Sequence, residues 1–196
     1  EKLESTYRLA KNTLLETEQF QGETCRFSTV YETSLHPFKI TNASLIGRPF
    51  TTPGSQQLKG SGGVLKLSLQ TFNSEISFSA IKPNRIRLYL KGQPQHINPL
   101  YELLLNNCQA VMMTKSESDP NPVRLPANII KPVGFGIDEG LLPYPDSSFV
   151  GYRLLTEYFT FPEKFMFIDI EGFADKLPAD TEDTLEFYIY LGHSDV

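Results

Sequence analysis

"VLKLSLQ" (Val64–Gln70) and "RIRLYLKG" (Arg85–Gly92) are two stretches in which apolar and polar residues alternate strictly. Successive side chains of a strand point to opposite faces of its sheet, so this period of two is typical of strands that cover a core with one face. The side chains expected to face the core are Leu65, Leu67, Leu69, Ile86, Leu88 and Leu90. Those expected to face outward are Lys66, Ser68, Arg85, Arg87, Tyr89 and Lys91.

Further strands are predicted before and after these two. β-Branched and aromatic residues on either side of Gln21-Gly22 indicate a hairpin with strands at Thr13–Glu18 and Thr24–Thr33. Pro37 interrupts the next run, which favours a separate or edge strand at Phe38–Ile46, and the prolines and glycines of residues 47–63 predict a loop. Other extended segments are expected at Cys108–Lys115, Ala127–Gly136, Lys164–Ile170 and Thr184–Gly192.

One helix is predicted at about 97–106, where the leucines of "NPLYELLLNN" recur at helical spacing. Asn98 is suited to cap the start of this helix, and Pro99 fits its first turn. We expect the helix to end near Asn106 or Asn107, because asparagine tolerates the left-handed conformation of a helix C-terminus.

A second helix is predicted at about 148–159, and Phe161-Pro162 should end it because proline disfavours helical geometry in the preceding residue. Its apolar residues form two rows that we expect to be buried: Phe149, Tyr152, Leu155 and Phe159 in one, Val150, Leu154 and Tyr158 in the other. Only Arg153, Thr156 and Glu157 are left for water. Arg153 and Glu157 stand four residues apart and are expected to pair at the surface.

Strands therefore dominate, and they do not alternate regularly with helices. This predicts a strand-dominated α+β fold, an antiparallel sandwich-like domain with two short helices. The expected organisation is a β-hairpin region at 1–46, a Gly/Pro-rich loop at 47–63 and a main β-rich domain with helices at 64–196, in one or two subdomains. The chain begins at Glu1, and we expect it to be an internal fragment of a longer polypeptide.

Composition argues against several functions. A net charge of -5 and the lack of a Lys/Arg cluster disfavour nucleic-acid binding, which needs cations to displace phosphate counterions. No apolar run reaches the roughly 18 to 20 residues of a membrane-spanning helix, so no direct membrane insertion is expected. The two cysteines, Cys25 and Cys108, are expected to be free, buried thiols.

Catalytic chemistry has little support in the sequence. His36 and His96 stand alone, and neither histidines nor cysteines show the spacing of a metal site, so no metal or cofactor is expected. The carboxylates that could act as acid and base are Asp138, Glu139, Glu157 and Glu163. Two alternatives stay open: a carboxylate-dependent hydrolase, and a carbohydrate-binding β-sandwich that would display tyrosines such as Tyr89 on one face.

Several segments carry a family resemblance, among them "YRLAKNTLLETEQFQGETCRFSTVYETSLHPFKITNASL", "LKLSLQT" and "NRIRLYLKG". The most specific is "VGFGIDEGLLPYPDSSFVGYRLLTEYFTFPEKFMFIDIEG", with the order GF, DE, LLPY, GYRLL, EYF, FPEKF. In these segments the chain resembles the TssF family of type VI secretion baseplate subunits. The similarity spans almost the whole chain, although members of the family are considerably longer.

The resemblance implies a structural role without a reaction or cofactor. The chain would be a wedge subunit of the baseplate of this contractile injection system, which is the platform for sheath and tube polymerisation. Implied partners are TssG, TssK, a second TssF copy and the VgrG hub, at the cytoplasmic face of the bacterial inner membrane. We expect Gly151, in the middle of the second helix, to permit close approach of another backbone, either within this domain or from a partner.

The resemblance also indicates residues that pack within the domain or form an interface. These are Gly134, Phe135, Asp138, Glu139, Leu142, Pro143, Tyr144, Gly151, Tyr152, Arg153, Leu154, Leu155, Glu157, Tyr158, Phe159, Phe161, Pro162, Glu163 and Phe165.

Overall fold

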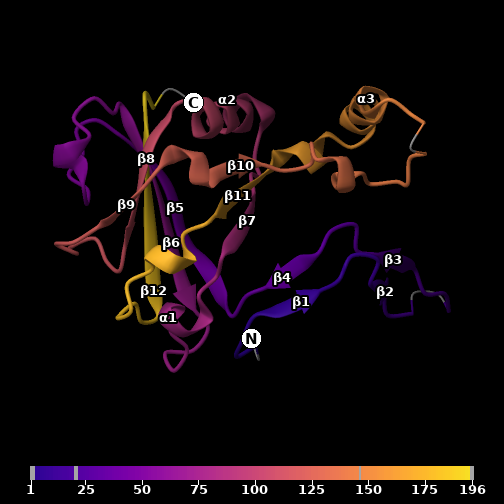
Figure 1. Ribbon diagram of the computed structural model, residues 1–196, viewed down its shortest axis with the longest axis horizontal. Helices are drawn as coiled ribbons and strands as arrows, with labels where there is room; N and C mark the ends of the chain where they lie inside the picture. The colour runs from indigo at the N-terminus through magenta and orange to yellow at the C-terminus, as the bar shows by residue number, and fades with distance from the viewer. Residues whose placement is uncertain (1–2, 20–21, 146, 195–196) are drawn as a thin grey trace.

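Two antiparallel sheets form the body of the molecule in a computed structural model, which describes residues 3–19, 22–145 and 147–194 (Figure 1). The larger sheet has the strand order β5-β6-β12-β8-β9 and the smaller one β10-β11-β7. The larger sheet contains β5 (Phe38–Gly47), β6 (Gly63–Thr71), β12 (Thr184–Leu191), β8 (Cys108–Thr114) and β9 (Val123–Leu125). The smaller sheet contains β10 (Ile130–Pro132), β11 (Phe167–Glu171) and β7 (Arg85–Tyr89). The expected strand-dominated, antiparallel α+β class is confirmed.

The main core lies between the two sheets. Leu67 and Leu69 of β6 and Phe187 of β12 share one cluster of buried residues with Ile86 of β7 and Ile168 of β11. The alternation in β6 and β7 thus correctly predicted which side chains face this core. β5 is an edge strand, as Pro37 indicated, and the division of the chain near residues 46 and 63 stays a prediction.

The opposite face of the larger sheet is also covered, which the alternation in β6 did not predict. The loop of residues 48–62 lies on this face, where Leu58 packs against Tyr188 and Tyr190. The expectation that Lys66 and Ser68 face water was therefore wrong: both side chains are largely shielded, and both contact Glu186. A strand covered on both faces must carry apolar residues on both, as β12 does.

The helices agree with the sequence in type and differ at their ends. α2 (Pro94–Asn106) begins before the predicted start, with Pro94 in its first turn, so Pro99 lies inside it. It ends at Asn106 as expected, but Asn107 has φ -119° and is not left-handed. α3 (Val150–Thr160) ends before Phe161-Pro162 as predicted.

A third, short helix was not predicted. α1 (Phe78–Ile81) is capped by Ser77, whose hydroxyl accepts a hydrogen bond from the Ala80 amide. Its single turn is too brief to show a helical period in the sequence.

Residues 3–19 and 22–35 form an arm that extends from the body on the same side as α3 (Figure 1). Here β1 (Tyr7–Leu9) pairs with β4 (Thr33–Leu35), and β2 (Leu14–Glu16) pairs with β3 (Arg26–Ser28). The latter pair confirms the predicted hairpin; of its expected turn, Gln21 lies outside the described residues and Gly22 has φ +86°. Both cysteines are free as expected, but Cys25 is exposed and only Cys108 is partly buried.

No helix within the described residues has the length and apolar character needed to cross a membrane.

Candidate functional site

α3 presents its aromatic side to solvent and its charged side to the protein. Phe149 is 71% exposed, Leu155 58% and Phe159 81%, whereas Arg153 and Glu157 retain only 5% and 6% exposure. The prediction that the apolar rows are buried and that Arg153 and Glu157 face water was therefore wrong. We call six of the exposed residues on α3 and directly before it the outer face of α3: Phe149, Tyr152, Leu155, Thr156, Tyr158 and Phe159.

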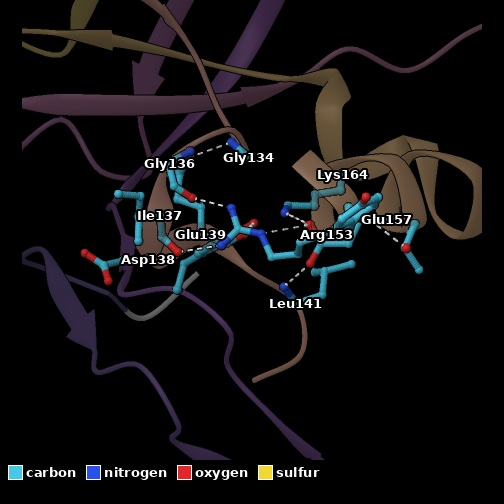
Figure 2. A network of polar contacts seen from close by, with 12 residues as sticks. Gly134, Gly136, Ile137, Asp138, Glu139, Leu141, Arg153, Glu157 and Lys164 are labelled. Carbon is cyan, nitrogen blue, oxygen red and sulfur yellow. Dashed lines mark hydrogen bonds and ion pairs between the residues drawn. The ribbon is translucent and has the colours of Figure 1, made fainter. Parts of the chain in front are cut away.

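Glu157 is the centre of the contacts beneath α3 (Figure 2). One carboxylate oxygen accepts a hydrogen bond of 2.7 Å from the Leu141 amide, and the other accepts from Nζ of Lys164. Lys164 is itself buried and lies 5.1 Å from the centre of the Phe165 ring. A buried charge needs such partners, because its desolvation is otherwise too costly.

Arg153 fixes the segment before α3 from the same side of the helix (Figure 2). Its guanidinium donates to the carbonyl oxygens of Ile137, at 2.5 Å, and Gly136, at 2.7 Å. Its Nε lies 3.9 Å from Glu157, too far for a hydrogen bond, so the predicted Arg153–Glu157 pair exists as a buried ion pair. Arg153 therefore acts mainly on backbone carbonyls.

Glu139 lies between the segment before α3 and the smaller sheet of the body. Its carboxylate accepts hydrogen bonds from the amides of Gly134, at 2.9 Å, and Gly136, at 2.8 Å. It also lies 4.0 Å from Arg87 of β7, which makes a two-pronged ion pair with Asp169 of β11 at 2.7 and 2.8 Å. We call Arg87, Glu139, Arg153, Glu157, Lys164 and Asp169 the charge network, which joins α3 to the smaller sheet.

The arm is attached next to the same network. The Tyr31 hydroxyl donates to the Glu139 carbonyl at 2.9 Å, and Arg87 lies over the Tyr31 ring. Burial, followed by the negative charge of Glu139, raises the pKa of Tyr31 to about 12. Lys11 adds a hydrogen bond of 3.0 Å to the Asp138 carbonyl. A groove of about 750 Å³ is lined by residues of the arm and of the segment 137–145.

His36 is a second attachment between arm and body. Its ring contacts the Thr6 hydroxyl at 3.1 Å and the Arg85 carbonyl at 3.2 Å, and it stacks on Phe38. Burial lowers the pKa of this histidine. These contacts fit the structural role expected of a histidine without catalytic partners.

The reversed orientation of α3 has a local cause. The segment of residues 134–141, which contains the 3-10 turn Ile137–Glu139, directs the carbonyls of Gly136 and Ile137 and the amide of Leu141 toward the helix. Backbone groups that a helix shields from water need hydrogen-bond partners. Arg153 and Glu157 are the two α3 side chains that supply them. With these two residues inward, helical geometry turns the aromatic rows outward.

The predicted interface and packing residues separate into three groups. The buried ones are Gly134, Arg153, Glu157 and Phe165, and the half-buried ones are Glu139, Gly151 and Leu154. The exposed ones are Phe135, Asp138, Leu142, Pro143, Tyr144, Tyr152, Leu155, Tyr158, Phe159, Phe161, Pro162 and Glu163. Sequence reasoning missed Arg87, Lys164, Asp169 and Tyr31, although a charged residue within each of two apolar strands was a signal for the Arg87–Asp169 pair.

Gly151 is closely approached by its own neighbour. A Cβ atom at this position would lie 2.4 Å from the Phe149 ring, and its other nearest contacts belong to the same ring. Within the described residues, a side chain rather than another backbone therefore occupies this space. The glycine lets Phe149 fold over the first turn of α3, where it meets Tyr152 edge-on.

The four carboxylates considered for catalysis do not come together in one site with their oxygens available to a substrate. Asp138 and Glu163 are exposed, while Glu139 and Glu157 are engaged by backbone amides and by Lys164. Tyr89, the candidate for carbohydrate binding, packs on Phe167 at 4.8 Å, and the exposed aromatic residues are divided among the arm, α3 with its two ends, and other segments. Among the residues that the structure describes, no three His, Cys, Asp or Glu side chains could together hold a metal ion.

The geometry defines an antiparallel α+β domain in which the charge network holds an aromatic helix at the surface. The family model described as "Type VI secretion system, TssF" matches residues 1–196, and the chain belongs to this family. It is 29% identical over 174 residues to the type VI secretion system component TssF1 of Pseudomonas aeruginosa, a match that covers 87% of the chain and 28% of that relative.

A solved structure has the same fold. The chain is similar to one in the cryo-electron microscopy structure of the TssK-TssF-TssG baseplate subcomplex of the type VI secretion system, with a TM-score of 0.74 and 22% sequence identity. The match covers 96% of this chain and 34% of the other. The chain thus spans about a third or less of the proteins that it resembles.

Proposed function

We propose that the chain is part of a structural wedge subunit of the type VI secretion baseplate and helps to assemble the platform for sheath and tube polymerisation. The observation that carries this proposal is the family match over residues 1–196. The proposed partners are TssG and TssK, a second TssF copy and the VgrG hub. The proposed location is the cytoplasmic face of the bacterial inner membrane.

The use of the polar groups supports a role in assembly without a reaction. The side chains of the charge network bond to backbone groups and to one another. They therefore stabilise the conformation of the segment around residues 134–141. Seven exposed large apolar residues lie on α3 or at its two ends, and such a patch is typical of a surface that meets another protein. We propose that the buried predicted residues serve packing and the exposed ones assembly.

Deletion and complementation test the proposal. In a bacterium lacking the full-length gene, we expect no sheath assembly, observed with a fluorescent sheath subunit, and restoration by the full-length protein. That protein should also co-purify with TssK and TssG. Sheaths of normal number in the deletion strain would contradict the proposed function.

A further inference from the structure

The outer face of α3 has the spacing of a helix-packing surface. Tyr152, Thr156 and Phe159 follow one another at intervals of four and three residues, and Leu155 lies beside them, while Phe149 precedes the helix as its N-cap. Residues at these intervals form one stripe along a helix, which a second helix can contact along its length. α3 has 11 residues and is therefore about 16 Å long, or three turns.

The exposed area is of the size that one protein presents to another. Buried aromatic residues cover about 150–250 Å² each, so the exposed fractions of Phe149, Tyr152, Leu155, Tyr158 and Phe159 leave on the order of 600 Å² uncovered. A standard interface buries about 800 Å² on each partner. The outer face of α3 could supply most of one side.

The charge of this face limits the partner's chemistry. The two charged residues of α3, Arg153 and Glu157, are both turned inward, so the helix offers aromatic rings, Leu155, and the hydroxyls of Thr156, Tyr152 and Tyr158. A charged partner residue would lose water here without gaining an opposite charge, which is costly. A fitting partner surface is therefore apolar and uncharged at its centre.

Contacts within the domain hold the outer face of α3 in place before any partner binds. The contacts of Glu157 with Leu141 and Lys164, and of Arg153 with two carbonyl groups, fix α3 from within the domain. Preorganisation reduces the entropy lost on binding. The binding surface is thus already formed when a separate polypeptide reaches it.

Together, these features point to a specific occupant. We propose that the outer face of α3 binds a helix of a different polypeptide, which presents an uncharged apolar stripe of about three turns. This inference rests on the proposed function, because it takes the baseplate subcomplex as the source of that helix.

Site-specific photo-crosslinking tests the occupant directly. Benzoylphenylalanine replaces Phe159 in the full-length protein, which is co-expressed with TssG and TssK, purified as a complex and irradiated. We expect one adduct to a co-expressed partner, mapped by mass spectrometry to a helix with an uncharged stripe. The control places the same photoreactive residue at Tyr89, another exposed aromatic residue away from α3, and should give no adduct to that helix.

Each outcome has a defined meaning. A complex that forms without an adduct at position 159, an adduct to a second copy, an adduct within the same polypeptide, or one to a charged non-helical segment overturns the docking inference alone. If the unmodified protein does not associate with TssG and TssK, the proposed function fails, and the inference that rests on it fails as well.

A charge-insertion variant gives an independent measurement. The double change Leu155→Glu and Phe159→Glu should weaken binding of the crosslinked partner at least tenfold, because it buries two carboxylates without counterions. Ile40→Glu, an exposed apolar-to-acidic change on β5, should leave the affinity within about twofold. Circular dichroism melting verifies that all variants are folded, and equal affinity of the double variant and Ile40→Glu contradicts the proposal.

Discussion

α2 and α3 carry similar apolar stripes, yet they face opposite ways. α2 buries Leu103 and Leu104 and exposes Glu102, whereas α3 buries Glu157 and exposes Leu155. The difference lies beneath each helix. α2 packs against the apolar strands of the main core, and α3 lies over a segment whose backbone groups need hydrogen bonds. The amphipathic pattern shows that a helix has two sides, and its neighbours decide which side is inside.

Removal of a buried carboxylate should have the largest effect. Glu157→Ala leaves Lys164 buried without its partner and the Leu141 amide without an acceptor, which we expect to cost about 3–5 kcal/mol of unfolding free energy. The matched change on α2, Glu102→Ala, should stay within about 0.5 kcal/mol because Glu102 is exposed. Urea unfolding measures both, and similar losses would show that the two helices do not differ in this way.

Truncation of leucines should give the reverse ranking. Leu104→Ala on α2 creates a cavity in the main core and should cost about 2–5 kcal/mol. Leu155→Ala on α3 removes an exposed side chain and should change stability by about 0.5 kcal/mol or less. A loss above 2 kcal/mol for Leu155→Ala in the isolated protein would contradict the exposed position of this residue.

A polar change on α3 should alter the surface more than the stability. Phe159→Asp should lower binding of the dye ANS to the protein, because it interrupts the exposed apolar stripe, while the unfolding free energy changes by about 0.5 kcal/mol or less. Fluorescence titration measures the dye, with Thr160→Asp as the control at the adjacent exposed position. Unchanged dye binding would indicate that the stripe is already covered.

A last effect concerns the arm and appears only at high pH. The pKa of Tyr31 is raised from the ordinary 10.0 to about 12, so the folded state keeps its phenol protonated where the unfolded state loses the proton. The resulting stability is complete below about pH 10 and is lost as the pH rises toward 12. We expect Tyr31→Phe, which cannot titrate, to lose less stability over this interval than the wild type. Parallel losses in the two proteins would contradict this pKa.

The strands were predictable because the sheets impose a period that the residues display. β6, β7, β8 and β12 lie where alternation or apolar runs indicated, and Pro162 correctly ended α3. The start of α2 was predicted too late because Asn98 and Pro99 form a convincing start signal inside a helix that Pro94 already begins.

The charge network was beyond sequence reasoning for a physical reason. Arg153, Glu157 and Lys164 are equally compatible with a solvated surface, and their burial depends on carbonyl and amide groups of residues 136, 137 and 141. Backbone groups in an irregular segment leave no trace in side-chain periodicity. Resemblance to the family identified the residues around this site, but it did not predict which side of α3 faces the protein.

The central position of β12 in the larger sheet affects how fast different parts of the molecule exchange their amide hydrogens. Its neighbours β6 and β8 pair with both of its edges, and side chains cover both of its faces. Its amides can therefore exchange with deuterium only when the whole sheet is disrupted, whereas the exposed two-stranded arm can open alone. The protein is thus expected to have a slowly exchanging centre and a rapidly opening arm.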